Sequence, residues 1–86
     1  ELRGIESKVR EYEGITNCIV FKSNEKNSKI VCAIETKNRN IDGLKNFLSK
    51  NLQNYMIPNI FIRYSQFPKN KNEKIDRKKI TKKFYN

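Results

Sequence analysis

Two β-branched segments separated by a polar stretch constrain the fold of this chain more than any other feature of its sequence. Residues 15–21 and 29–36 are rich in Ile, Val and Thr, which is typical of strands, whereas residues 22–28 between them are polar and turn-forming. This arrangement predicts a β-hairpin with a long loop. A chain of 86 residues buries only about 60–65% of the surface that its unfolded form exposes. We therefore expect the hairpin to belong to one compact core, with no room for a large active-site cavity.

Amphipathic helices are expected before and after the hairpin. Apolar residues recur every three or four positions from Leu2 to Tyr12, and Gly14 follows as a helix stop. A second helix is expected to begin with Asn38 or Asn40 as its N-cap. Its apolar residues have the same spacing: Ile41, Leu44, Phe47, Leu48 and Leu52.

The C-terminal third of the chain predicts one more strand and one more helix. Residues 60–64 are typical of a short strand, and a polar loop of residues 69–75 follows Pro68. Asp76 lies where an N-cap would, so we expect a short, lysine-rich helix in residues 76–86. The predicted order is helix, strand, strand, helix, strand, loop and helix. This order indicates an α+β domain with helices packed on a small, mostly antiparallel sheet.

The residue inventory excludes several kinds of active site. The sequence contains no histidine, which excludes Ser-His-Asp and Cys-His catalysis and His-ligated zinc. Its three glycines are too far apart for a phosphate-binding loop. Cys18 and Cys32 lie in apolar runs, so we interpret them as buried hydrophobic residues in preference to a disulfide or a reactive thiol. We interpret Glu6, Glu11 and Glu13 as the solvated face of the first helix.

Membrane and secretion signals are not visible in the sequence. No segment approaches the roughly 20 apolar residues that cross a bilayer, and the N-terminal residues lack the apolar core of a signal peptide. We therefore expect a cytoplasmic protein with no membrane partner. The chain begins at Glu1 and its only methionine is Met56, so we also expect it to be a piece of a longer protein.

The formal net charge of +10 permits two interpretations. Residues 69–86 carry eight basic and two acidic residues, which would suit a basic binding module for nucleic acid or for an acidic partner protein. The other interpretation is a solvated tail whose lysines reflect AT-rich codons. The basic residues are 14 Lys and only 5 Arg, whereas proteins that read phosphates and bases favour the bidentate Arg fork. We therefore keep nucleic acid as the alternative partner.

Three short segments carry the strongest functional signal. Residues 1–6 have the sequence Glu-Leu-Arg-Gly-Ile-Glu, residues 52–58 Leu-Gln-Asn-Tyr-Met-Ile-Pro, and residues 72–77, a little after Pro68, Asn-Glu-Lys-Ile-Asp-Arg. They resemble, in turn, the motifs E-L-G-E-I-E, L-P-x-Y-M-I-P and L-P-x-x-x-N-G-K-x-D-R of the C-terminal subdomain of the adenylate-forming, or AMP-binding, enzyme superfamily. The resemblance covers essentially the whole chain. It looks closer to nonribosomal peptide synthetase adenylation domains and D-alanine–carrier-protein ligases than to acyl-CoA synthetases.

The resemblance implies an activity and partners. Residues 1–86 would form the mobile C-terminal lid of a larger ligase that joins an amino acid to ATP, releases pyrophosphate and passes the aminoacyl group to the phosphopantetheine thiol of a carrier protein. ATP and Mg²⁺ would be bound mainly by a large N-terminal adenylation subdomain of the same polypeptide. The isolated chain is therefore expected to be inactive. A free-standing ligase and one module of a synthetase both fit this resemblance.

The resemblance also assigns site residues. Lys74 matches the lysine of the N-G-K motif, the one catalytic group that the small subdomain contributes in that family, and would contact the α-phosphate of ATP and the substrate carboxylate. An ammonium group between these two anions stabilises the negative charge of the transition state. The family glycine before this lysine is Glu73 here, which places a carboxylate beside the expected triphosphate. Four further lysines are expected to dock an acidic carrier protein: Lys78, Lys79, Lys82 and Lys83.

Overall fold

The order of helices and strands along the chain is the predicted one. The computed structural model describes residues 1–24 and 26–84, so Glu25 of the predicted hairpin loop and residues 85–86 of the predicted basic tail lie outside the described residues. Two short 3₁₀ helices, η1 and η2, add to the predicted elements. The elements are α1 (Leu2–Arg10), β1 (Ile15–Lys22), β2 (Ile30–Thr36), α2 (Asp42–Asn51), η1 (Asn54–Met56), β3 (Ile60–Tyr64), α3 (Arg77–Thr81) and η2 (Lys82–Phe84). The α+β class is confirmed.

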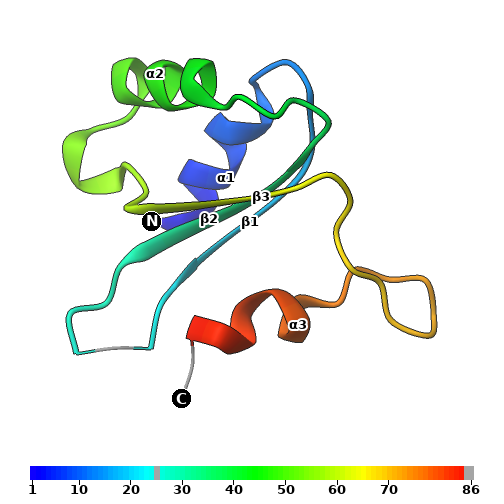
Figure 1. The fold of residues 1–86 in the computed structure, drawn as a ribbon. Coiled ribbons are helices and arrows are strands. Elements are labelled where there is room, and N and C mark those ends of the chain that lie inside the picture. The colour runs from blue at the N-terminus through cyan, green and yellow to red at the C-terminus, as the bar shows by residue number, and fades with distance from the viewer. Residues whose placement is uncertain (25, 85–86) are drawn as a thin grey trace.

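The three strands form one sheet in the order β1, β2, β3 (Figure 1). β1 and β2 make the predicted antiparallel hairpin, with Val20 opposite Cys32 and a register shift between Ile15 and Asn17. β3 pairs with β2 in parallel, with Ile34 opposite Arg63. Two parallel neighbours cannot be joined by a tight turn, so the chain crosses from β2 to β3 through α2 and η1.

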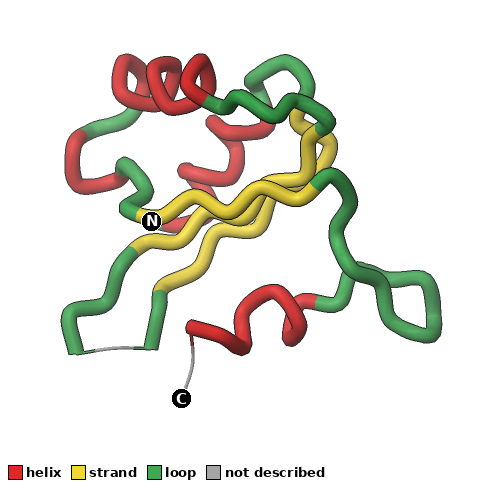
Figure 2. Tube along the Cα trace, viewed as in Figure 1, coloured by secondary structure: helices red, strands yellow, loops and turns green. Residues whose placement is uncertain are grey.

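Helices cover both faces of the sheet (Figure 2). Because successive side chains of a strand point to opposite faces, β1 and β2 supply two separate apolar clusters. On the face under α1 and α2, the buried residues are Ile5, Val9, Cys18, Val20, Cys32, Ile34, Leu44 and Leu48. On the face under α3, they are Ile19, Phe21, Val31, Ala33, Phe67 and Ile80. α1 and α2 each contribute two buried apolar side chains four residues apart, whereas α3 contributes Ile80.

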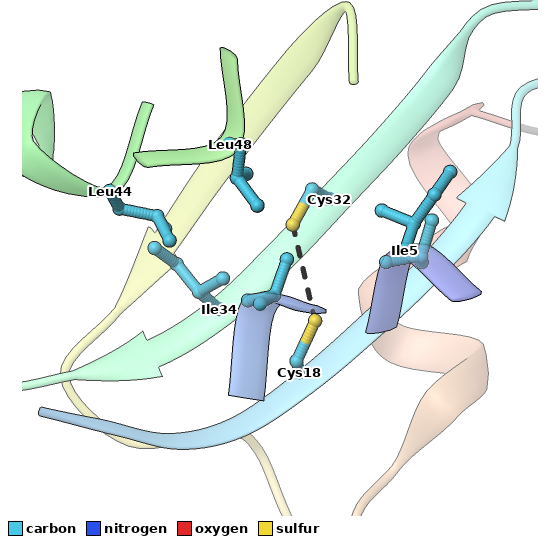
Figure 3. Close-up of a cluster of buried hydrophobic side chains, with 8 residues drawn as sticks. Ile5, Cys18, Cys32, Ile34, Leu44 and Leu48 are labelled. Carbon is cyan, nitrogen blue, oxygen red and sulfur yellow. Dashed lines mark hydrogen bonds between the residues drawn. The ribbon is translucent and has the colours of Figure 1, made fainter. Parts of the chain in front are cut away.

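The two cysteines lie inside the first cluster, as Figure 3 shows. Both are free and fully buried, and their Sγ atoms are 4.0 Å apart. The hydrogen bond between the two thiols and burial in the apolar core raise the pKa of Cys32 far above its ordinary value. A thiol held neutral in this way is a poor nucleophile, so the interpretation of these residues as buried hydrophobic side chains is confirmed.

The polar face of α1 closes the free edge of the sheet. Oε2 of Glu6 accepts a hydrogen bond from the Val20 N–H at 2.9 Å, and Nη2 of Arg10 donates to the Cys18 carbonyl at 2.9 Å. The interpretation of Glu6 as a solvated carboxylate is therefore wrong, because this side chain satisfies an edge-strand donor. Edge strands that expose such groups invite pairing with other chains, and α1 prevents that over part of β1.

The predicted residues mark two of the helix ends, but the prediction of Asn38 or Asn40 as the N-cap of α2 is wrong, because the N-cap is Ile41. Gly14, with φ of 93°, turns the chain between α1 and β1 in a conformation that favours glycine. Asn40 lies just before α2, and its Oδ1 accepts a hydrogen bond from the Asp42 N–H at 2.8 Å. Asp76 caps α3 through a 3.1 Å hydrogen bond from the Lys79 N–H. None of the described helices combines the length and apolar character that crossing a membrane requires.

Candidate active site

Lys74 lies in a tight, hydrogen-bonded turn that joins β3 to α3. Lys69 and Ile75 form an isolated antiparallel bridge, and the Asn70 N–H donates to the Lys74 carbonyl at 2.8 Å. Next to this bridge, on the side away from the tip of the turn, the Asp76 N–H donates to the Pro68 carbonyl at 2.8 Å. The predicted polar loop is therefore an ordered hairpin-like turn, the orange segment that projects from the sheet in Figure 1.

The tip of this turn is closed by Asn70. Its Oδ1 accepts hydrogen bonds from the Asn72 N–H at 2.8 Å and from the Lys74 N–H at 3.1 Å, and its carbonyl accepts one from the Glu73 N–H at 3.0 Å. An Asn side chain that bonds the backbone two residues further on is a common way to stabilise a turn.

Glu73 adopts a backbone conformation that favours glycine. Its φ is 66°, and it is the one non-glycine residue with a positive φ in residues 1–24 and 26–84. In an L-residue with a side chain this conformation costs roughly 1–2 kcal/mol. The glycine of the N-G-K motif thus has a structural reason at this position, and the present chain keeps the turn without it.

The side chain of Lys74 is exposed. It forms no ion pair with a carboxylate among the described residues, in which Lys8 and Glu11 form the ion pair that is present. Asn72 and Glu73 beside it are also exposed. An ammonium group with no carboxylate partner can be offered to an external anion. The turn therefore presents the Lys74 ammonium group to solvent on a hydrogen-bonded backbone.

The base of the turn is tied to the sheet through Glu35, which the sequence did not single out. Oε2 of Glu35 accepts a hydrogen bond from the Phe67 N–H at 2.6 Å. Oε1 accepts from Oγ1 of Thr16 at 2.7 Å and from Nδ2 of Asn17 at 3.0 Å. Partial burial by itself raises the pKa of Glu35, but these hydrogen bonds and the charge of Lys69 outweigh it and lower the pKa below its ordinary value. Only the tertiary pairing brings these groups together, because they come from β1, β2 and the segment after β3.

The lysines predicted to dock a carrier protein are exposed, and three of them lie together. Lys78, Lys79 and Lys82 line one open depression with Asp76 and Thr81. Lys83 is not among the residues that line it, and its Nζ lies 6.0 Å from the centre of the Phe84 ring. The structure therefore groups three of the four predicted residues on α3 and its end.

The first two motifs meet at the opposite side of the molecule from α3. Leu2, Arg3, Tyr55 and Met56 contribute to one groove, together with other residues of α1 and the ends of β1 and β2. Met56 packs against the first core cluster, whereas Tyr55 is 72% exposed. Lys74 is not among the residues that line this groove. The first two motifs thus share one surface, and the Lys74 motif lies on another.

A metal site is not formed by the part of the chain that the structure describes. Within residues 1–24 and 26–84, no three Cys, Asp or Glu side chains gather closely enough to hold a metal ion.

Comparison with known proteins agrees with the motifs. No family model matches the chain. The chain is 41% identical over 83 residues to bacitracin synthase 1 of Bacillus licheniformis, an overlap that covers 93% of the chain and 2% of that protein. It is 30% identical over 95 residues to the D-alanine–D-alanyl carrier protein ligase of Lactococcus lactis subsp. lactis, which covers 96% of the chain and 19% of that protein. A solved four-domain nonribosomal peptide synthetase, bound to AMP and glycine, matches with a TM-score of 0.75 and 37% identity over 90% of the chain and 6% of that protein.

The chain belongs to the adenylate-forming enzyme superfamily. It corresponds to the C-terminal subdomain of a superfamily member, and its relatives include peptide synthetases and a carrier-protein ligase. The chain spans only a small part of the relatives that it matches, from 2% of the first to 19% of the second. The turn that carries Lys74 is the candidate active-site segment of this chain.

Proposed function

We propose that this chain is the mobile C-terminal lid of an ATP-dependent, amino-acid-activating ligase and that Lys74 is its catalytic residue. The observation that carries the proposal is the exposed Lys74 on a hydrogen-bonded turn, with no ion-pair partner among residues 1–24 and 26–84, within a segment similar to the N-G-K-x-D-R motif. We place this enzyme in the cytoplasm, where ATP is available.

The proposed chemistry requires a positive charge between two anions. A carboxylate oxygen of the amino acid attacks the α-phosphorus of ATP, and the bond from that phosphorus to the bridging oxygen breaks, releasing pyrophosphate. Lys74 would lie between the carboxylate and the α-phosphate and would stabilise the charge that concentrates there in the transition state. Mg²⁺ and most of the ATP would be bound by the large N-terminal subdomain.

The second half-reaction does not need Lys74 at the α-phosphate. The phosphopantetheine thiol of a carrier protein attacks the acyl carbon, AMP leaves, and the thiol proton passes to a base. A lid that carries its lysine in for the first step and away for the second suits a group on a projecting turn. We expect the isolated chain to be inactive, because one lysine on an exposed turn does not form a cavity for ATP.

Separate measurement of the two half-reactions tests the role of Lys74. In the intact polypeptide that contains this chain, we expect Lys74→Ala to slow ATP–pyrophosphate exchange by roughly 10²–10³-fold, the usual loss for one transition-state donor. Thiol transfer from a supplied aminoacyl-adenylate should be unchanged within a few-fold. Lys71→Ala is the matched control, because it removes the same charge from the same exposed turn. Equal slowing of both half-reactions by Lys74→Ala would overturn the assignment.

A second proposed contact is between α3 and the carrier protein. Lys78, Lys79 and Lys82 line one open depression, and such a positive surface suits an acidic partner. Reversal of these three charges to Glu should abolish acylation of the carrier protein while ATP–pyrophosphate exchange continues. Unchanged acylation would overturn this contact. Binding of duplex or single-stranded DNA with a steep salt dependence would favour the nucleic-acid alternative.

A further inference from the structure

Both backbone polar groups of Lys74 are held by one residue, Asn70. The Lys74 N–H donates to Oδ1 of Asn70 at 3.1 Å, and the Lys74 carbonyl accepts from the Asn70 N–H at 2.8 Å. The peptide groups on the two sides of the Lys74 Cα are therefore fixed by the same partner, and this fixes the direction in which the Lys74 side chain leaves the turn.

The same side chain also holds the neighbours that set this direction. Oδ1 of Asn70 accepts a second hydrogen bond from the Asn72 N–H at 2.8 Å, and the Asn70 carbonyl accepts from the Glu73 N–H at 3.0 Å. Glu73 has a φ of 66° without being glycine. A residue in this region persists only where the surrounding hydrogen bonds hold it there.

The packing of the turn argues against a role for Asn70 in the stability of the core. All residues from Lys69 to Lys74 are exposed, and neither apolar cluster includes any of them. The hydrogen bonds of Asn70 thus order a projecting turn and contribute little to the packed interior.

We propose that Asn70 is the positioning residue of Lys74: its side-chain oxygen holds the turn in the geometry that aims the Lys74 ammonium group. This inference rests on the proposed function of Lys74. Asn70 itself need not touch ATP or the amino acid. Its loss would leave the lysine present but badly placed, and a displacement of about 1 Å can cost of the order of 10²-fold in rate.

The test compares variants of the intact polypeptide in both half-reactions. The substrate is the amino acid that gives the wild-type protein its fastest ATP–pyrophosphate exchange in a screen of the common amino acids. We expect Asn70→Ala to slow exchange by about 10–100-fold and to leave thiol transfer from the supplied adenylate within a few-fold of wild type. Asn70→Ser should recover part of the exchange rate, because its hydroxyl oxygen can accept the same backbone N–H groups.

Asn59→Ala is the matched control. Oδ1 of Asn59 also accepts a backbone hydrogen bond, from the Ile30 N–H at 2.8 Å, but Asn59 lies before β3, whereas the Lys74 turn follows the other end of that strand. We expect this variant to lose a comparable hydrogen bond and to keep the wild-type rates of ATP–pyrophosphate exchange and of thiol transfer.

The outcomes separate this inference from the proposed function. If Asn70→Ala exchanges pyrophosphate at the wild-type rate while Lys74→Ala is strongly slowed, the positioning role alone is overturned. Equal slowing of both half-reactions by Asn70→Ala, or no recovery in Asn70→Ser, would also overturn it. Normal exchange by Lys74→Ala would overturn the proposed function, and the positioning role with it.

Discussion

At the scale of single residues, the turn that carries Lys74 is a strained but well-connected piece of backbone. Glu73 occupies the left-handed region, in which a side chain costs roughly 1–2 kcal/mol. The hydrogen bonds of Asn70 hold this conformation. The side chain of Glu73, where the family motif has glycine, therefore adds strain to this turn.

Replacement of Glu73 by glycine should stabilise the protein. Glycine adopts a positive φ without strain, and this gain exceeds the entropy that glycine adds to the unfolded chain, so we expect Glu73→Gly to raise the free energy of unfolding by about 0.5–1 kcal/mol. Urea unfolding followed by circular dichroism measures this change. Glu13→Gly is the control, because Glu13 is exposed and has a negative φ, and it should destabilise slightly. A loss of stability in Glu73→Gly would contradict the strain argument.

At the scale of elements, Glu35 connects the strands to the turn. Its carboxylate accepts hydrogen bonds from Thr16 and Asn17 of β1 and from the Phe67 N–H, where the chain leaves the sheet toward Lys74. The Phe67 ring is buried against the second cluster and lies 5.2 Å from the Tyr64 ring. Glu35 and the buried Phe67 ring thus both hold the base of the turn against the sheet.

The stability contributed by Glu35 should depend on pH. Its pKa is lowered in the folded protein, so its contribution is fully present above the ordinary value of 4.5 and is lost as the pH falls through the lower, folded value. We expect Glu35→Gln to lower the free energy of unfolding by about 1 kcal/mol at pH 7, because the neutral amide accepts fewer hydrogen bonds.

Urea unfolding of wild type and Glu35→Gln from pH 7 to pH 3 measures this contribution of Glu35 to stability. Wild type should lose stability below about pH 4.5, whereas Glu35→Gln should lose less, so that the difference between the two proteins shrinks. A difference that stays constant from pH 7 to pH 3 would show that the charge of Glu35 has no role.

At the scale of the whole molecule, the sheet separates two independent apolar clusters. Ile5 on α1 lies in the cluster under α1 and α2, and Ile80 on α3 lies in the cluster on the opposite face. They share no cluster neighbours, since each cluster uses different strand residues. Substitutions on the two faces therefore act on separate contacts.

The two faces should contribute additively to stability. We expect Ile5→Val and Ile80→Val each to cost about 0.5–1.5 kcal/mol, and the double variant to cost their sum within about 0.5 kcal/mol. Urea unfolding of the wild type and the three variants gives the coupling energy. A coupling energy well above that margin would mean that packing on one face depends on the other.

Much of this architecture is encoded locally and was predictable from the sequence. Strand and helix periodicity predicted α1, α2 and the three strands, because side-chain alternation depends only on backbone geometry. The cap at Asp76 was predictable for the same reason, since its side chain bonds a backbone N–H three residues away. The N-cap of α2 was not, because the side chain of Asn40 forms a local turn one residue before the cap at Ile41. The motif around Lys74 indicated the candidate catalytic residue, which stays a proposal.

The tertiary structure alone decided how these pieces meet. That β3 lies parallel to β2, that Glu6 closes the edge of β1, and that Glu35 ties three segments together all depend on residues at least 14 positions apart. Local preferences do not determine such contacts, because they form only when burial of both faces of the sheet outweighs the entropy of closing long loops. The sequence by itself determined the helices, the strands and the candidate catalytic residue Lys74, whereas tertiary packing determined the position of the turn that carries Lys74.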